Sequence, residues 1–234
     1  MRPTLPARRS GQARRVRIAV AAAAALGVAA ALSGCSSASE DDLLAEAQAV
    51  AEEYLAAIAD QDQETADAMT EASELEVTDV DETVDVRAAL PGAAEPITEV
   101  WLQFLGQEET GSGTNVTFEV SYLIGDAPGA KWIELWHADG DPADAWTVTE
   151  GLLVYSDVFA DRETVPSFTF GGVELQSTET SNVSIWGYPG AYLTEAVETE
   201  QGVTVEPVSV VLGAEVTPPW NDSLPMLEGV SDED

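Results

Sequence analysis

The stretch Val116-Thr117-Phe118-Glu119-Val120-Ser121-Tyr122-Leu123 alternates apolar with mostly polar side chains. A period of two places successive side chains on opposite faces of a β-strand, so this stretch predicts a strand with one buried face. Residues 97–105, 131–137 and 145–154 are further candidate strands, and a turn-rich stretch at residues 138–142 separates the last two. Together these segments predict an antiparallel sheet.

A helical pattern lies upstream of the predicted sheet, because apolar residues recur there at intervals of three or four. They are Leu44, Ala47, Ala51, Leu55 and Ile58. This spacing predicts an amphipathic helix, and Asp41 and Asp42 at its start suit the helix dipole. After a polar break at residues 60–63, residues 64–69 predict a second short helix. Residues 71–95 predict an acidic loop with a short strand.

The last part of the chain is all-β in character. Two apolar segments within residues 168–175 flank Gly171-Gly172, a dipeptide that supplies the positive φ angles of a two-residue hairpin. We expect four to six short strands over residues 164–216, after a linker at residues 156–163. Residues 217–234 contain three prolines and an acidic end, which predict a disordered acidic tail.

The N-terminal residues follow the plan of an export signal. Six arginines and no acidic residue precede an uninterrupted small and apolar run over residues 18–32. This run has 15 residues, whereas a membrane-spanning helix needs about 20. The pattern therefore predicts a cleaved signal peptide over residues 1–34 rather than a permanent membrane span.

The apolar run ends in Leu32-Ser33-Gly34-Cys35, which resembles the lipobox of bacterial lipoproteins at all four positions. The resemblance implies cleavage between Gly34 and Cys35 and a diacylglycerol on the Cys35 sulfur. Two acyl chains anchor a protein stably, because each buried methylene contributes about 0.8 kcal/mol. We therefore expect a lipoprotein on the extracytoplasmic face of the cell membrane. The alternatives are a soluble secreted protein with a chance cysteine and a short membrane anchor.

The exported part is strongly acidic. Without residues 1–34 it contains Arg87, Lys131 and Arg162 as its only basic side chains besides His137, against all 43 acidic ones, which gives a net charge of about −40. Nucleic acid is excluded as a partner, because its binding depends on cationic neutralisation of phosphates. The charge itself is open to two interpretations, either solubility alone or an acidic binding face.

Four features of the N-terminal half form a recognisable set: a helix over residues 47–58, an acidic break at residues 60–62, Ala66 with Met69, and a late strand Trp146-Thr147-Val148. The set resembles the nuclear-transport-factor-2-like domains of many bacterial lipoproteins and covers roughly residues 40–155. The resemblance implies an α+β fold, in which helices pack on a curved antiparallel sheet and form a cone. A small all-β domain would follow it.

The Gly-Gly hairpin and the later Tyr188-Pro189-Gly190-Ala191-Tyr192 resemble the small β modules of teicoplanin-resistance-associated envelope proteins. Those proteins commonly carry a cysteine-rich zinc ribbon and a membrane helix, and this sequence shows neither, so the resemblance bears on architecture alone. The predicted plan is a signal peptide over 1–34, a lipidated tether over 35–40, the nuclear-transport-factor-2-like domain over 41–155, the small β domain over 164–216 and the disordered acidic tail over 217–234.

Residues that could carry catalysis are scarce. Besides Cys35, which the lipid would occupy, nucleophile and base chemistry could use only His137 and Lys131, and His137 is better explained as an ordinary strand-end residue. A carboxylate could act in a cone-shaped pocket, as in the isomerases and cyclases that share the cone fold. Nothing in the spacing of Glu119, Glu134 and Glu150 distinguishes any of them for that role.

Metal and cofactor sites are not predicted. Acidic residues cluster at residues 79–82 and 139–144, but neither cluster follows the EF-hand pattern, so we interpret both as solvated loops. One cysteine and one histidine cannot build a zinc site. No phosphate-binding loop or dinucleotide motif is present, so no cofactor is expected.

These features favour a noncatalytic binding or interaction module of the cell envelope. Its expected partners are the membrane, through the lipid anchor, and either a small apolar ligand or an envelope protein. A carboxylate-dependent isomerase or cyclase in a cone-shaped pocket is the main alternative. A structural spacer with a repulsive surface is a third.

Overall fold

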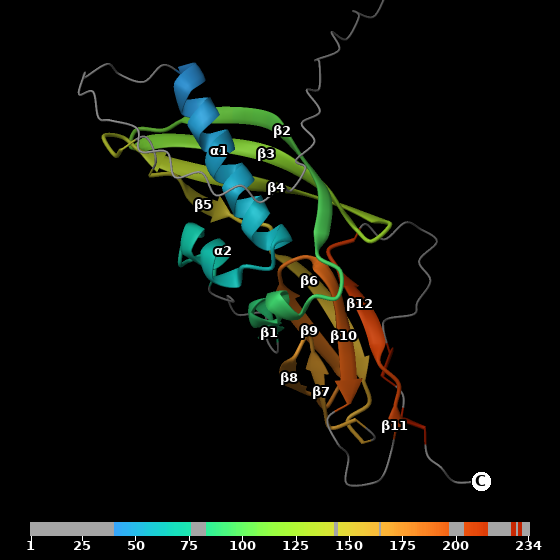
Figure 1. Ribbon diagram of the computed structural model, residues 1–234. Helices are drawn as coiled ribbons and strands as arrows, with labels where there is room; N and C mark the ends of the chain where they lie inside the picture. Colours follow the sequence, from blue (N-terminus) through green and yellow to red (C-terminus); the bar gives the residue numbers. More distant parts are fainter. Residues whose placement is uncertain are drawn as a thin grey trace, which may run out of the picture.

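The computed structural model describes residues 40–75, 83–142, 145–163, 165–196, 204–214, 226–227 and 229–230 (Figure 1). Of these, 51% lie in strands and 20% in helices. The strands form three four-stranded sheets and one two-stranded sheet. The predicted α+β fold, a cone of helices packed on a curved sheet followed by a small β domain, is therefore wrong. The protein is mostly β.

The helices come early in the chain. They are α1 (Glu40–Ala59), α2 (Gln63–Met69) and the short 3-10 helix η1 (Arg87–Gly92). Both α-helices start close to where their sequence patterns predict. In α2, Asp62 caps the N-terminus, because its side chain accepts a hydrogen bond from the Thr65 backbone N–H at 3.1 Å.

The first sheet, called here the long sheet, is antiparallel in the order β2-β3-β4-β5. Its strands are β2 (Ile97–Glu109), β3 (Gly113–Ile124), β4 (Ala127–Ala138) and β5 (Thr147–Glu150). Burial alternates along β3 as predicted from the opening stretch. Val116, Phe118, Val120 and Tyr122 are buried, and the residues between them are not.

One face of the long sheet shares a hydrophobic core with α1 (Figure 1). Tyr54 and Ile58 of α1 are fully buried in the same cluster as Phe118 of β3 and Ile133 of β4. The inward positions predicted for this helix are confirmed at Ala47, Ala51, Leu55 and Ile58, which are buried, whereas Leu44 is partly buried.

The second sheet, the mixed sheet, joins segments far apart in the sequence in the order β1-β9-β6-β13. Its strands are β1 (Thr83–Asp85), β9 (Asn182–Gly187), β6 (Val154–Ala160) and β13 (Met226–Leu227). β1 runs parallel to β9, and β6 antiparallel to it. Segments on both sides of the predicted domain boundary therefore share one sheet. This long-range pairing is one reason why the fold differs from the prediction.

The linker expected at residues 156–163 belongs in large part to β6. Ser156 and Asp157 made this segment look like a loop, but both belong to a strand that buries Val158 and Ala160, and Asp157 points to the face opposite these two residues. The Ser184 hydroxyl of β9 donates a hydrogen bond to the Asp157 carboxylate at 2.6 Å. A polar side chain such as that of Asp157 is compatible with a strand when a residue on the neighbouring strand forms a hydrogen bond with it.

The third sheet, the hairpin sheet, has the order β12-β10-β7-β8. Its strands are β12 (Val208–Leu212), β10 (Gly190–Ala196), β7 (Ser167–Phe170) and β8 (Val173–Gln176). Gly171 and Gly172 connect β7 to β8 with φ angles of 53° and 88°, which confirms the predicted two-residue hairpin. A second hydrophobic core lies under the hairpin and mixed sheets and includes Phe168 and Ile185.

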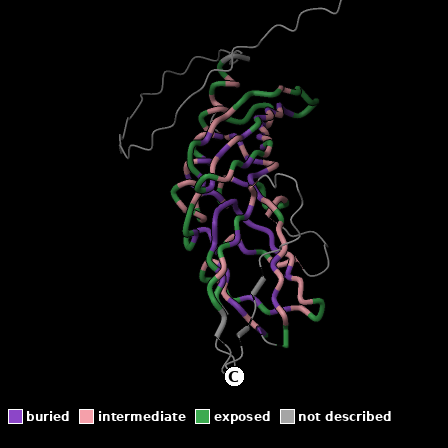
Figure 2. The backbone as a smooth tube through the Cα atoms, turned by 90° about the vertical axis from the view of Figure 1, so that its right-hand side faces the viewer, coloured by how far each residue is buried: buried purple, intermediate pink, exposed green. Residues whose placement is uncertain are grey.

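Short strands also occur inside the segment predicted as a tail. β14 (Gly229–Val230) pairs with β11 (Thr204–Val205), and β13 pairs with β6. The other residues of that segment lie outside the described part of the chain, as do the signal peptide and Cys35. Figure 2 shows buried backbone in both halves of the molecule. Among the described helices, none has the length and hydropathy needed to cross a bilayer.

Candidate functional site

The outward face of the long sheet carries three tryptophans. Because Phe118 and Val120 point into the core, Glu119 between them points outward, and cross-strand partners share its face. The register places Gln103 of β2 and Trp132 of β4 beside Glu119. In the next outward row, Trp101 lies beside Ser121.

Two further outward rows continue along the strands. In the first, Glu134 lies between Thr117 and Glu150. In the second, Trp136 lies between Asn115 and Thr147, and Glu108 pairs with Asn115 from the other side. We call these outward residues the tryptophan face. Its members are Trp101, Gln103, Glu108, Asn115, Thr117, Glu119, Ser121, Trp132, Glu134, Trp136, Thr147 and Glu150.

The tryptophans differ in how they are held. Trp132 is 55% exposed, while Trp101 and Trp136 are half-buried. The ring of Trp136 lies against Gly113, where even a β-carbon would clash with it. Leu105, which lies at an irregularity in the register of β2, adds a further 51% exposed apolar side chain at the edge of this face. A rigid sheet thus presents several large apolar groups to solvent.

Carboxylates separate the tryptophans. Burial, and then the negative charges of Glu150 and Glu108, raise the pKa of the Glu134 carboxyl above its ordinary value. Among the described residues, no basic side chain belongs to this face, since Arg87 and Arg162 lie on other elements and Lys131 points to the opposite side of β4. The tryptophan face is therefore both aromatic and negatively charged.

The Lys131 ammonium is held by hydrogen bonds on the side of the long sheet opposite the tryptophan face. It donates hydrogen bonds to the carbonyl oxygens of Gly151 at 2.9 Å and Leu153 at 2.8 Å. Burial lowers its pKa, although the charges of Glu150 and Glu74 act in the opposite direction. Because two backbone carbonyls hold this ammonium, it is a poor candidate for a free base or nucleophile.

A recess of about 310 Å³ lies between the long and mixed sheets. Its walls include Glu74, Lys131, Glu150, Tyr155 and Trp186. Glu74 accepts a hydrogen bond from the Gly151 N–H at 3.2 Å, and burial raises its carboxyl pKa. Glu150, which follows the irregular pairing of β5 with β4, lies at the border between this recess and the tryptophan face, whereas Glu119 and His137 lie outside the recess.

His137 has a structural role at the end of β4. Its Nε2 lies 2.9 Å from the Pro142 carbonyl oxygen, and because a carbonyl only accepts, Nε2 is the donor. Its ring packs against Trp146 with the centroids 5.0 Å apart. His137 therefore stabilises the loop that follows β4 through its contacts with Pro142 and Trp146. Among the described residues, no three potential ligands gather to hold a metal.

The space in which a cone-shaped pocket was expected is filled by core side chains. Tyr54 of α1 is completely buried there, and its hydroxyl accepts a hydrogen bond from the Leu152 N–H at 2.9 Å. Desolvation raises the pKa of this phenol, so it stays neutral. Neither Glu119 nor Glu134, which both point outward, reaches this core.

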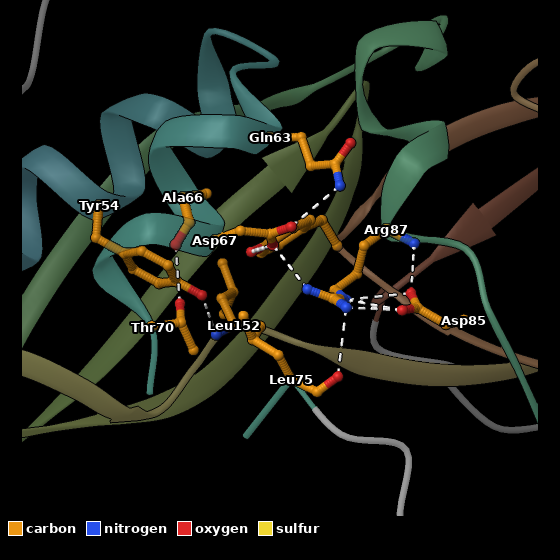
Figure 3. A network of polar contacts seen from close by, with 10 residues as sticks. Tyr54, Gln63, Ala66, Asp67, Thr70, Leu75, Asp85, Arg87 and Leu152 are labelled. Carbon is orange, nitrogen blue, oxygen red and sulfur yellow. Dashed lines mark hydrogen bonds and ion pairs between the residues drawn. The ribbon is translucent and has the colours of Figure 1, made fainter. Parts of the chain in front are cut away.

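A polar network around Arg87 joins α2 to the mixed sheet (Figure 3). The guanidinium contacts Asp85 at 2.7 Å and Asp67 at 3.0 Å, and lies 5.5 Å from the centre of the Trp186 ring. The Tyr188 hydroxyl donates to Asp67 at 2.7 Å. Sequence reasoning missed this network. The signal that could have revealed it is the presence of one arginine in an otherwise acidic segment.

We compared the chain with protein-family models, with curated proteins and with solved structures, and none of these comparisons finds a match.

Proposed function

We propose that this protein is a noncatalytic interaction module of the cell envelope. A lipid on Cys35 would hold it at the extracytoplasmic face of the membrane, and the tryptophan face would bind an envelope protein. The observation that carries the proposal is the placement of Trp101, Trp132 and Trp136 on the sheet face that α1 leaves uncovered.

Tryptophan is unusually effective at such a surface. It is enriched among the residues that contribute most to protein interfaces, because it buries a large area when it is covered. The backbone of the long sheet is fixed by hydrogen bonds on both sides of β3 and β4, so little order would have to be gained on binding. Polar neighbours such as Gln103 and Ser121 would supply directional hydrogen bonds.

The tether supports a partner close to the membrane. α1 begins at Glu40, five residues after Cys35. Five extended residues span at most about 18 Å. The long sheet, which shares its core with α1, would therefore stay near the bilayer surface. A membrane protein or another lipoprotein could reach it there.

Removal of the anchor is the first test. We expect a Cys35→Ser variant of the full chain to move from the membrane fraction to the soluble fraction, because the thiol that carries the acyl chains is lost. The measurement is fractionation with labelling by a radioactive fatty acid, and Ser39→Ala is the matched control. A Cys35→Ser protein that remained in the membrane fraction would show that residues 18–32 form a permanent anchor.

Position-specific crosslinking tests the binding face. We expect a photoreactive p-benzoylphenylalanine at position 132 to form an adduct with one envelope protein, identified by mass spectrometry, in cells of the producing bacterium. The same group at position 174, an exposed position on β8, is the control. The proposal would be overturned if positions 101, 132 and 136 gave no adduct, or the same adducts as position 174.

A further inference from the structure

We propose that the tryptophan face recognises a cationic segment of its partner, a short extended stretch in which arginine side chains alternate with small residues. This inference rests on the proposed function and adds the chemistry of the partner. Each guanidinium would lie on a tryptophan ring and pair with a neighbouring carboxylate.

The distribution of charge supports a cationic occupant. Glu119 lies directly beside Trp132, and Glu134 lies two residues from both Trp132 and Trp136 on the same strand face. Glu108 on β2 and Glu150 on β5 add negative charge on either flank of these two glutamates. An uncharged or acidic partner would bury these carboxylates without counter-charges, which is strongly unfavourable.

The aromatic rings supply an independent reason. A cation within about 6 Å of an indole ring is attracted by its negative face, by about 0.5–1 kcal/mol at an exposed site. Arginine also keeps its charge at any relevant pH and stacks its planar group on aromatic rings. Lysine also carries a positive charge near neutral pH, but it lacks the planar group that stacks on aromatic rings.

The protein already contains this arrangement in its own partly buried Arg87 network. Arg87 lies 5.5 Å from the centre of the Trp186 ring, and its guanidinium contacts the carboxylates of Asp85 and Asp67. The tryptophan face displays the same two components, indole and carboxylate, but among the described residues no arginine accompanies them. The arginine would come from the partner.

The spacing of the face sets the length of the segment. From the row of Ser121 to that of Asn115 is six residues along β3, or about 20 Å at 3.4 Å per residue. An extended peptide of about six residues would therefore cover Trp101, Trp132 and Trp136. Alternating side chains of such a peptide point to one side, so every second residue would meet the face.

The test uses a defined peptide and the mature lipoprotein in neutral detergent micelles. The probe is the capped hexapeptide Arg-Ser-Arg-Ser-Arg-Ser, and its control has citrulline, an uncharged analogue, in place of each arginine. Calorimetry at 150 mM salt limits the long-range attraction of the acidic protein, because the Debye length is then about 8 Å. We expect the arginine peptide to bind at least tenfold more tightly than the citrulline peptide.

Matched variants distinguish binding at the tryptophan face from a general attraction of the peptide to an acidic protein. We expect Glu134→Gln and Trp132→Gln each to weaken binding at least fivefold, and Glu174→Gln, which removes the same charge from β8, to change it less than twofold. Equal losses in Glu134→Gln and Glu174→Gln, equal binding of both peptides, or no binding of the arginine peptide would each overturn the inference. A crosslinked partner at position 132 would still uphold the proposed function. Thermal unfolding of each variant verifies its fold.

Discussion

Replacement of Arg87 by alanine is expected to lower the free energy of unfolding by about 2–3 kcal/mol, because removing the cation from a partly buried ion-pair network leaves the two carboxylates without their counter-charge. The Arg87 side chain is only 14% exposed. Burial lowers its pKa, but hydrogen bonds and charges from Asp85 and Asp67 outweigh that effect and raise it overall. The variant would leave both carboxylates and the Leu75 carbonyl oxygen without this donor.

Arg162→Ala is the matched control, since it removes the same charge from an exposed site. The Arg162 side chain is 56% exposed, and it contacts Glu179, which is 89% exposed, at 3.5 Å. Exposed pairs of this kind contribute less than about 1 kcal/mol. Denaturant unfolding of both variants gives the comparison. If Arg162→Ala cost as much as Arg87→Ala, net charge rather than the network would control stability.

Substitution of Gly171 is expected to have a similarly large effect. Alanine at this positive φ costs about 1–2 kcal/mol. A β-carbon here would also meet the Tyr192 ring at 2.8 Å and the Ala89 β-carbon at 2.9 Å. Overpacking of this kind adds about 1–3 kcal/mol. Gly171→Ala should therefore lower the free energy of unfolding by about 3 kcal/mol.

Gly172 supplies the control for that substitution. Its φ is also positive, at 88°, but nothing lies within 4 Å of the position that a β-carbon would occupy. Gly172→Ala should cost only the conformational part, about 1–2 kcal/mol. Thermal or denaturant unfolding measures both variants. Equal losses would mean that Tyr192 and Ala89 accommodate the added β-carbon without strain, which would contradict the expected overpacking.

Local patterns predicted the local elements of this fold. The alternation in β3, the inward residues of α1 and the glycine pair of the β7–β8 hairpin were all read from spacing. Each of these depends on neighbours a few residues apart, which is the range over which periodicity and turn geometry act. The lipid anchor on Cys35 was predicted in the same way, and it stays a prediction.

The candidate site could be predicted only in part. Residues 131–137 were predicted as a strand, but its two faces are similarly mixed in polarity. One face carries Lys131, Ile133, Leu135 and His137, and the other carries Trp132, Glu134 and Trp136. The choice between them depends on α1, which covers Ile133 and Leu135 and leaves the tryptophans outside. No spacing within the strand contains that information.

The sequence by itself therefore determined the two α-helices, the strands of the long sheet and the β7–β8 hairpin, the burial pattern in β3 and α1, and the acidic character that excludes nucleic acid as a partner. Only the tertiary structure decided that the protein is mostly β and that β1 pairs with β9 about 100 residues away. It also decided that three tryptophans share the face of the long sheet opposite α1. The physical reason is that strand pairing and face burial depend on surfaces from distant segments, and these surfaces exist only once the chain has folded.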